Sequence, residues 1–274
     1  MANPIKQLVG ETAIYGLSTI LARVVNFLLV PLYSRVLTQS QYGSVTYFLA
    51  FIAVLQVVLT LGLETGCFRY SQKEGKNPDS VFSTAFMAVL LLCSLFLLVV
   101  TVWSRDIADA LQYTGYGKII VYVGVILLLD SVTAILFARL RAEHKAIKFA
   151  VVRTLKIFTE VGVNLLLYLV LPRYVATHPG AFILNFVSAS PDFTYAIFAI
   201  MASCVVCTVL LVPEILRLSF RIDLGLAKEL LLYSLPLMLA GLPGVMNDFV
   251  DRFMLSELIP GGEEVWRAQL GVYQ

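Results

Sequence analysis

Long apolar runs recur along the whole sequence, and they constrain the fold more than any other feature. A helix needs roughly 20 apolar residues to cross a hydrocarbon core of about 30 Å. Inside lipid the backbone must satisfy its own hydrogen bonds, so only helices and closed β-barrels span it. The runs here are continuous rather than alternating in polarity, which indicates helices. The sequence therefore predicts an all-α fold, a polytopic transmembrane helix bundle.

The composition agrees with a chain that lies mostly in lipid. Of its 274 residues 59% are hydrophobic and only 14% are charged, whereas a soluble domain has about 25% charged residues. The mean hydropathy is +0.86. The net charge of +2 is spread over several loops, and this indicates no nucleic-acid partner. Membrane lipids are the expected surroundings.

Seven spans are predicted, with ends uncertain by a few residues. They are residues 12–34, 44–65, 81–103, 118–138, 151–171, 193–213 and 230–256. The first run lacks the short apolar core and the cleavage site of a signal peptide, so we expect it to remain as a span. The first six spans form a predicted bundle over residues 1–225, and residues 226–274 begin a second bundle that the chain does not complete.

Basic residues are distributed unequally between the two sets of loops. Thirteen Lys and Arg residues fall on the side of the N-terminus, and five fall on the other side. These five are Arg35, Arg105, Lys118, Arg173 and Arg267. Basic loops stay in the cytoplasm, so the asymmetry predicts a multi-pass protein of the bacterial cytoplasmic membrane with its N-terminus inside. The most basic loop, residues 139–149, is interpreted as an anchor near anionic head groups.

The sequence offers no set of residues typical of catalysis. It has no phosphate-binding glycine loop, zinc signature or nucleophile–histidine arrangement. Cys204 and Cys207 form a C-x-x-C inside a span, where two small packing residues are the expected interpretation rather than a redox or metal pair. We therefore predict that the protein is not an enzyme and has no cofactor or metal centre, with Na⁺ or H⁺ as candidate coupling ions.

Polar side chains recur at helical spacing inside several spans. Ionisable groups in a span cost roughly 2.5–3.5 kcal/mol and normally face a bundle interior or a wet cavity. Residues four apart lie on one face of a helix. The predicted site residues are Arg23 and Asn26 in the first span, Gln56 and Glu64 in the second, and Asp248, Asp251 and Arg252 in the seventh.

Each polar stripe also has a structural interpretation. Lys156 and Glu160, four residues apart in the fifth span, are expected to pair with each other. Asp130 in the fourth span is expected to bind the backbone or a hydroxyl of a neighbouring helix. Arg23 is different, because it has no acidic residue three or four positions away, so it needs a partner on another helix or in solution.

An internal repeat is suggested by two similar segments. Residues 26–37 (NFLLVPLYSRVL) align with residues 247–258 (NDFVDRFMLSEL), beginning with Asn26 and Asn247. The first and seventh spans run in the same direction, so the similarity favours a parallel repeat. In that plan two six-helix bundles are related by an axis along the membrane normal and share a central site.

Several segments together resemble one membrane protein family. They are PLYSRVLTQSQYGSVTYF (31–48), LGLETGCFRYSQKEG (61–75), RLRAEHKA (139–146) and KELLLYSLPLMLAGLPGVMNDFVDRFML (228–255). They resemble the polysaccharide biosynthesis flippases of the multidrug/oligosaccharidyl-lipid/polysaccharide exporter superfamily. Members typically have twelve to fourteen spans in two bundles. The resemblance therefore implies that this chain covers the first bundle and the first helix of the second.

The resemblance implies a function without covalent chemistry, namely moving an undecaprenyl-diphosphate-linked oligosaccharide to the outer leaflet. Arg23 and Arg252 would contact the diphosphate, because a guanidinium binds phosphate oxygens with two prongs. Glu64, Asp248 and Asp251 would bind a coupling ion or sugar hydroxyls. Other polysaccharide-assembly proteins are candidate partners.

Two alternatives stay open. A cation-coupled multidrug exporter of the same superfamily would use the carboxylates for a cationic drug and Arg23 as a counter-ion. A membrane-embedded glycosyltransferase, polymerase or ligase would need catalytic groups at the membrane surface, often on a large outer loop, and the outer loops here are short.

Overall fold

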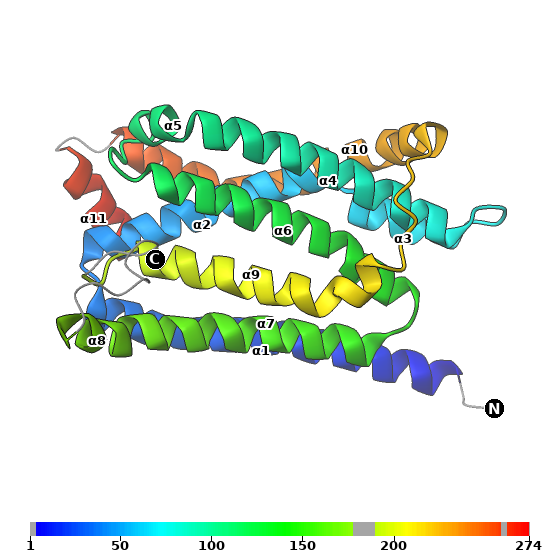
Figure 1. Cartoon of the computed structure of the whole chain (residues 1–274), viewed down its shortest axis with the longest axis horizontal. Coiled ribbons are helices and arrows are strands. Elements are labelled where there is room, and N and C mark those ends of the chain that lie inside the picture. Colours follow the sequence, from blue (N-terminus) through cyan, green and yellow to red (C-terminus); the bar gives the residue numbers. More distant parts are fainter. Residues whose placement is uncertain (1–3, 178–189, 259–261, 274) are drawn as a thin grey trace.

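The computed structural model describes residues 4–177, 190–258 and 262–273, and these are helical apart from short connections. Figure 1 shows long helices lying side by side in alternating directions. The long helices are α1 (Pro4–Val36), α2 (Gln39–Thr60), α4 (Pro78–Val102), α6 (Gly117–Ala142), α7 (Ala146–Leu165), α9 (Thr194–Ile215) and α10 (Leu224–Leu258). The shorter elements are α3 (Leu63–Ser71), α5 (Ser104–Ala110), the π-helical turn η1 (Leu166–Val170), α8 (Leu171–Thr177) and α11 (Glu263–Tyr273).

Among the described residues, six helical segments are long and apolar enough to cross a membrane. They are Gln39–Ser71, Pro78–Val102, Gly117–Ala142, Ala146–Val175, Thr194–Ile215 and Leu224–Asn247. This confirms the all-α, multi-pass prediction for six of the seven spans. The first predicted span lies within helix α1, whose described part contains a shorter apolar stretch, Phe27–Val36. That α1 also crosses the membrane stays a prediction.

The connections alternate between the two ends of the bundle, as the predicted loops require. In Figure 1, α5, α8 and α11 gather at one end, whereas the N-terminus and the α3–α4, α6–α7 and α9–α10 connections lie at the other. We call the first the α5 end and the second the N-terminal end. Between the fifth and sixth predicted spans, α8 runs to Thr177, and residues 178–189 lie outside the described ranges.

The second span is broken near the N-terminal end of the bundle. Helix α2 ends at Thr60, and both Leu61 and Gly62 have left-handed backbone conformations before α3 begins. Gly62 (φ +67°) is needed for a second reason, because a Cβ there would lie 2.7 Å from the backbone oxygen of Ser234 in α10. Gln56 and Glu64, predicted to lie within one span, therefore lie on two different helices, α2 and α3, and do not share a single helical face.

Helix α11 lies against the first turns of α2 at a crossing of two glycines. A Cβ at Gly43 would lie 1.9 Å from the backbone oxygen of Arg267, and a Cβ at Gly271 would lie 2.1 Å from that of Gln39. Small residues let helix backbones approach this closely. Beside the crossing, Trp266 is buried and its indole Nε1 donates a hydrogen bond of 3.0 Å to Gln112 Oε1. The crossing fixes α11 at the α5 end.

Candidate functional site

The seven predicted site residues lie on α1, α2, α3 and α10. The side chains of Arg23, Asn26 and Asp248 lie outside the described part of the structure. Their roles stay predictions. Gln56, Glu64, Asp251 and Arg252 are described, and they belong to elements that pack against one another, because α10 contacts both α2 and α3. We refer to this contact as the α2–α10 interface.

Arg252 connects the two helices of the α2–α10 interface directly. Its Nη1 donates a 3.0 Å hydrogen bond to the backbone oxygen of Thr46 in α2. Asp251 is exposed and has interactions of its own. Asp248 lies four residues before Arg252, but its side chain lies outside the described part of the structure. The arginine thus lies partly buried between two spanning helices, with part of its guanidinium committed to the backbone.

Gln56 lies further along α2 toward the N-terminal end and carries an unsatisfied polar atom. Its Oε1 is buried and accepts no hydrogen bond within the described part of the chain. A buried acceptor without a donor costs roughly 1–3 kcal/mol, so Gln56 Oε1 is suited to receive a hydrogen bond from a ligand or a water. Glu64, beyond the helix break, makes a loose 3.5 Å contact with Arg141 Nη2 of α6.

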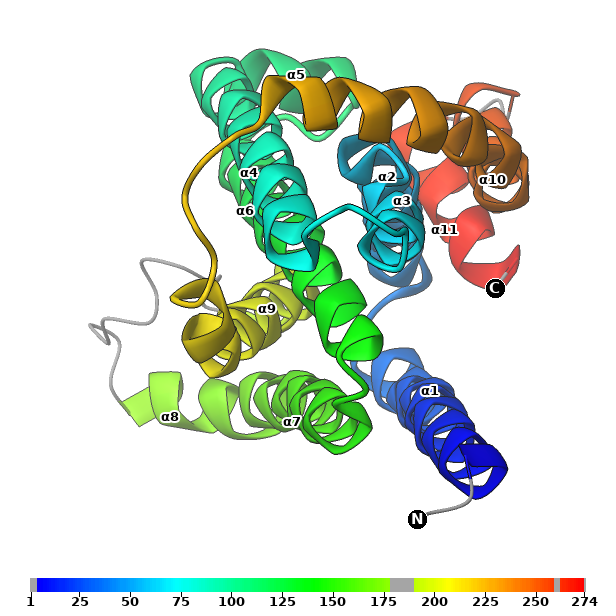
Figure 2. The same ribbon diagram turned by 90° about the vertical axis from the view of Figure 1, so that its right-hand side faces the viewer.

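Helix α1 belongs to a different part of the bundle from the α2–α10 interface. The hydroxyl of Tyr33 donates a 3.0 Å hydrogen bond to Asn164 Oδ1 of α7, and the rings of Tyr15 and Phe149 meet edge to face at 5.0 Å. Viewed toward the N-terminal end, α1 and α7 lie on one side and α10 on the other (Figure 2). The predicted residues of α1 are therefore separated from those of α10.

An ion pair inside the bundle corrects the prediction for Lys156. Its Nζ lies 2.5 Å from Asp130 Oδ1 on α6, rather than bonding to Glu160 on its own helix. Cys204 Sγ of α9 lies 3.3 Å from the same oxygen, so three helices meet at Asp130. The sequence contained the signal, namely opposite charges in two consecutive spans. The spacing within one helix favoured the wrong partner. Cys204 and Cys207 are buried core residues, as predicted.

The basic loop of residues 139–149 forms ion pairs within the protein. Arg139 is buried and contacts Asp79 Oδ1 at 2.7 Å and Glu143 Oε1 at 2.6 Å. Lys148 Nζ lies 2.5 Å from the buried Glu214 of α9. Burial opposes ionisation of Glu143, but hydrogen bonds from Lys145 and Arg139 hold the pKa of Glu143 below its ordinary value. This loop therefore joins helices in addition to any role as a membrane anchor.

The α2–α10 interface is closed at the N-terminal end by polar contacts that the sequence analysis missed. Arg69 Nη1 lies 2.8 Å from the Tyr233 hydroxyl, and the guanidinium lies over the Tyr233 ring at 4.6 Å. Lys76 Nζ lies 2.8 Å from Glu229 Oε2, and this hydrogen bond raises the pKa of Lys76. These partners are more than 150 residues apart, so no local pattern could have paired them.

Comparison with known families identifies the chain. A family model described as Polysaccharide biosynthesis protein matches residues 8–274. The chain belongs to this family. No curated protein and no solved structure matches it. With six helices able to span a bilayer, it is a multi-pass membrane protein of a transporter-type family whose members are typically not enzymes. The resemblance inferred from residues 31–48, 61–75, 139–146 and 228–255 is thereby confirmed at the level of the family.

Proposed function

We propose that this polysaccharide biosynthesis protein is a flippase, which moves a polyprenyl-diphosphate-linked oligosaccharide from the inner to the outer leaflet of the cytoplasmic membrane. The observation that supports this most directly is the series of polar groups along the second span, in α2 and α3: Thr46 with Arg252 of α10, then Gln56, then Glu64. Polar groups on spanning helices normally face a substrate or ion path. Family membership over residues 8–274 supports the sugar class of the substrate.

The chemistry of the substrate fits polar groups at several depths. A sugar and a diphosphate cannot enter hydrocarbon without compensating hydrogen bonds, whereas the prenyl chain stays in lipid. Thr46 and Gln56 are ten residues apart on α2, or about 15 Å along the helix axis. A diphosphate at Arg252 could therefore be accompanied by a sugar hydroxyl that donates to Gln56 Oε1. Glu64 offers acceptors nearer the N-terminal end.

In the proposed function, Arg23 and Asn26 contact the substrate from the opposite side of its path. In the two-bundle plan, with residues 1–225 as the first bundle and 226–274 as the start of the second, the seventh predicted span faces the first across a central cavity. Arg23 would supply a second guanidinium for the diphosphate. Asp248, Asp251 and Glu64 would bind Na⁺, H⁺ or sugar hydroxyls. The internal repeat on which this plan depends stays a proposal.

Reconstituted vesicles test the function with the substrate itself. The purified full-length protein is placed in liposomes with a fluorescent polyprenyl-diphosphate sugar, and an impermeant reductant bleaches the outer leaflet. Transport makes the remaining fluorescence accessible. Arg252→Ala should slow this phase about 10- to 150-fold, because hydrogen bonds to a charged group contribute roughly 1.5–3 kcal/mol. Arg252→Lys should retain part of the rate, since it keeps the charge and loses the two-pronged geometry.

The controls separate the proposal from its alternatives. Arg35→Ala removes an exposed cation at the end of α1, and it should leave the rate unchanged. Imposed Na⁺ and pH gradients show whether transport is coupled. Transport of a cationic dye with no movement of the sugar lipid would favour the drug-exporter alternative. Unaltered sugar-lipid transport by well-folded Arg252→Ala would remove Arg252 from the site.

A further inference from the structure

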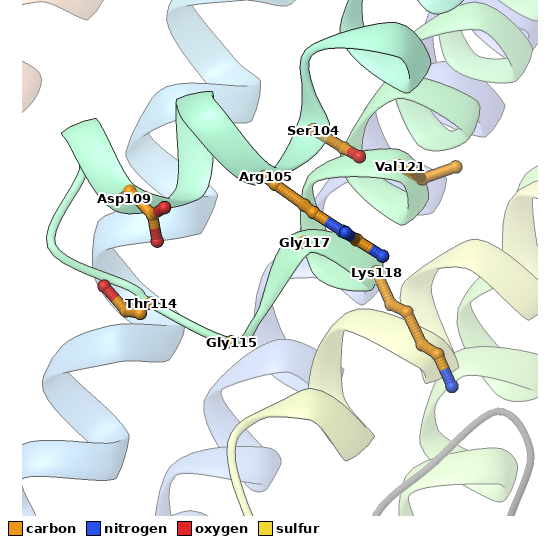
Figure 3. A pocket seen from close by; sticks show the side chains of 8 residues that line it. All are labelled: Ser104, Arg105, Asp109, Thr114, Gly115, Gly117, Lys118 and Val121. Carbon is orange, nitrogen blue, oxygen red and sulfur yellow. The ribbon is translucent and has the colours of Figure 1, made fainter.

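A polar pocket at the α5 end has no role in the proposed transport path. It lies between the end of α4 and the start of α6 and has a volume of about 480 Å³. Its lining residues, drawn in Figure 3, are Ser104, Arg105, Asp109, Thr114, Gly115, Gly117, Lys118 and Val121. Both α4 and α6 are membrane-spanning segments, so the segment that joins them lies at the boundary between hydrocarbon and water. Lipid phosphates occupy that depth.

The charges of this pocket are arranged for an anion. Arg105 and Asp109 are four residues apart in α5, a spacing at which they could pair. Yet Arg105 forms no ion pair within the described part of the chain. Figure 3 shows the side chains of Arg105 and Lys118 extending to the same side of the pocket, away from Asp109. Two cations on one side of a pocket give it a positive potential, which attracts an anion.

The aliphatic stem of Arg105 lies beside the first residue of the next helix. A Cβ at Gly117 would lie 3.5 Å from Arg105 Cγ and 3.6 Å from the backbone oxygen of Ser104, which are ordinary van der Waals distances. The start of α6 therefore forms one wall of the pocket next to Arg105. The hydroxyls of Ser104 and Thr114 add donors on either side of the pocket. A phosphate there would have two cations and hydroxyl donors.

An apolar stripe on α4 leads to the same pocket. Leu91, Leu95, Leu98 and Val102 follow at spacings of four, three and four residues, and each side chain is more than half exposed. Such residues lie on one face of a helix. Trp103, half exposed, follows directly, and tryptophan favours the head-group level of a bilayer. An acyl chain along the stripe would place its phosphate beside Arg105.

We propose that this pocket binds the phosphate of an anionic membrane lipid, whose acyl chain lies along the exposed stripe of α4. In the orientation predicted from the loops, the lipid belongs to the outer leaflet. Arg105 and Lys118 bind the phosphate, and Ser104 and Thr114 donate to its oxygens. Asp109 opposes an anion and limits its affinity. The site is independent of the α2–α10 interface.

Native mass spectrometry of the full-length chain in detergent tests the site with defined lipids. Phosphatidylglycerol, phosphatidylcholine and inorganic phosphate are titrated separately, and the bound fraction gives an affinity for each. Phosphatidylglycerol should bind at least about fivefold tighter than phosphatidylcholine, since each basic residue near a lipid surface contributes roughly that factor. Arg105→Gln should weaken phosphatidylglycerol binding about fivefold, and Arg105→Gln with Lys118→Gln about 25-fold. Asp109→Asn should strengthen it.

The matched control is Arg35→Gln, which changes the net charge equally at another exposed cation of the α5 end. It should leave the affinity unchanged. Equal losses in Arg35→Gln and Arg105→Gln would overturn the proposal, because binding would then follow net charge alone. Displacement of phosphatidylglycerol by millimolar inorganic phosphate would overturn the assignment to a lipid. If Arg105→Gln does not fold, Lys118→Gln should show the same fivefold loss of affinity, whereas Arg105→Lys, which keeps the charge, should retain most of it.

Discussion

Replacing Gly43 by alanine should release α11 from the bundle. A Cβ at this position would lie 1.9 Å from the backbone oxygen of Arg267 and 2.9 Å from its carbonyl carbon. An ordinary carbon–oxygen contact is about 3.3 Å, so α11 must withdraw by about 1.4 Å, the difference of 3.3 and 1.9. The obstructing atoms are backbone, which cannot rotate away as a side chain would.

The expected loss of α11 docking follows from the cost of overpacking, which is roughly 1–3 kcal/mol for an added carbon in a tight contact. The ratio of docked to undocked α11 should therefore fall about 5- to 150-fold. The same substitution favours the helical state of α2 by roughly 0.5–1 kcal/mol. Global stability and docking should consequently change by different amounts, and a readout on α11 itself is needed.

Trp266 provides this readout because it is only 2% exposed when α11 is docked. In a Trp103→Phe background it is the sole tryptophan of the chain. Acrylamide quenching of its fluorescence should rise in Gly43→Ala. The matched control is Gly162→Ala in α7, where a Cβ meets nothing within 4 Å, and quenching should stay low. If Gly43→Ala quenches no more than Gly162→Ala, the close approach of α2 and α11 is wrong.

Three further predictions concern charge and topology. Removing one partner of the Lys156–Asp130 ion pair, by Asp130→Asn or Lys156→Met, should lower thermal stability more than removing both. An unpaired charge costs roughly 3–5 kcal/mol where it is fully buried, and less here, where the two side chains are 22% and 23% exposed. Equal loss in the double variant would contradict this. Glu143, whose pKa is held low in the folded protein, should stabilise the fold fully above about pH 4.3, the ordinary pKa of a glutamate. This contribution to the free energy of unfolding should be lost as the pH falls through the lower pKa of the folded state. The stability of Glu143→Gln should therefore depend less on acid. The four native cysteines are buried, so single added cysteines report topology. An impermeant maleimide should label Thr114→Cys from outside the cell and fail to label Glu74→Cys. The opposite result would reverse the predicted orientation.

The sequence by itself determined the class of the protein and its spans. An apolar run of about 20 residues satisfies its backbone hydrogen bonds in lipid by forming a helix. These hydrogen bonds join residues close together in the chain, so they can be predicted from the sequence. For that reason the predicted span 118–138 corresponds closely to α6 (Gly117–Ala142), and 81–103 to α4 (Pro78–Val102). The family was also readable from contiguous segments, since a family pattern is a property of residue order.

Only the tertiary structure decided which polar residues meet. Lys156 has a potential partner four residues away in Glu160, but it bonds to Asp130 because α6 and α7 bring that carboxylate within 2.5 Å. The break at Leu61 and Gly62 likewise follows from a contact, because α10 passes too close to Gly62 for any side chain to fit. Helix formation depends on neighbours along the chain, whereas a buried charge is satisfied by whichever helix packs against it. The sequence order does not contain that packing, so the pairing of Arg252 with Thr46 became visible only in three dimensions.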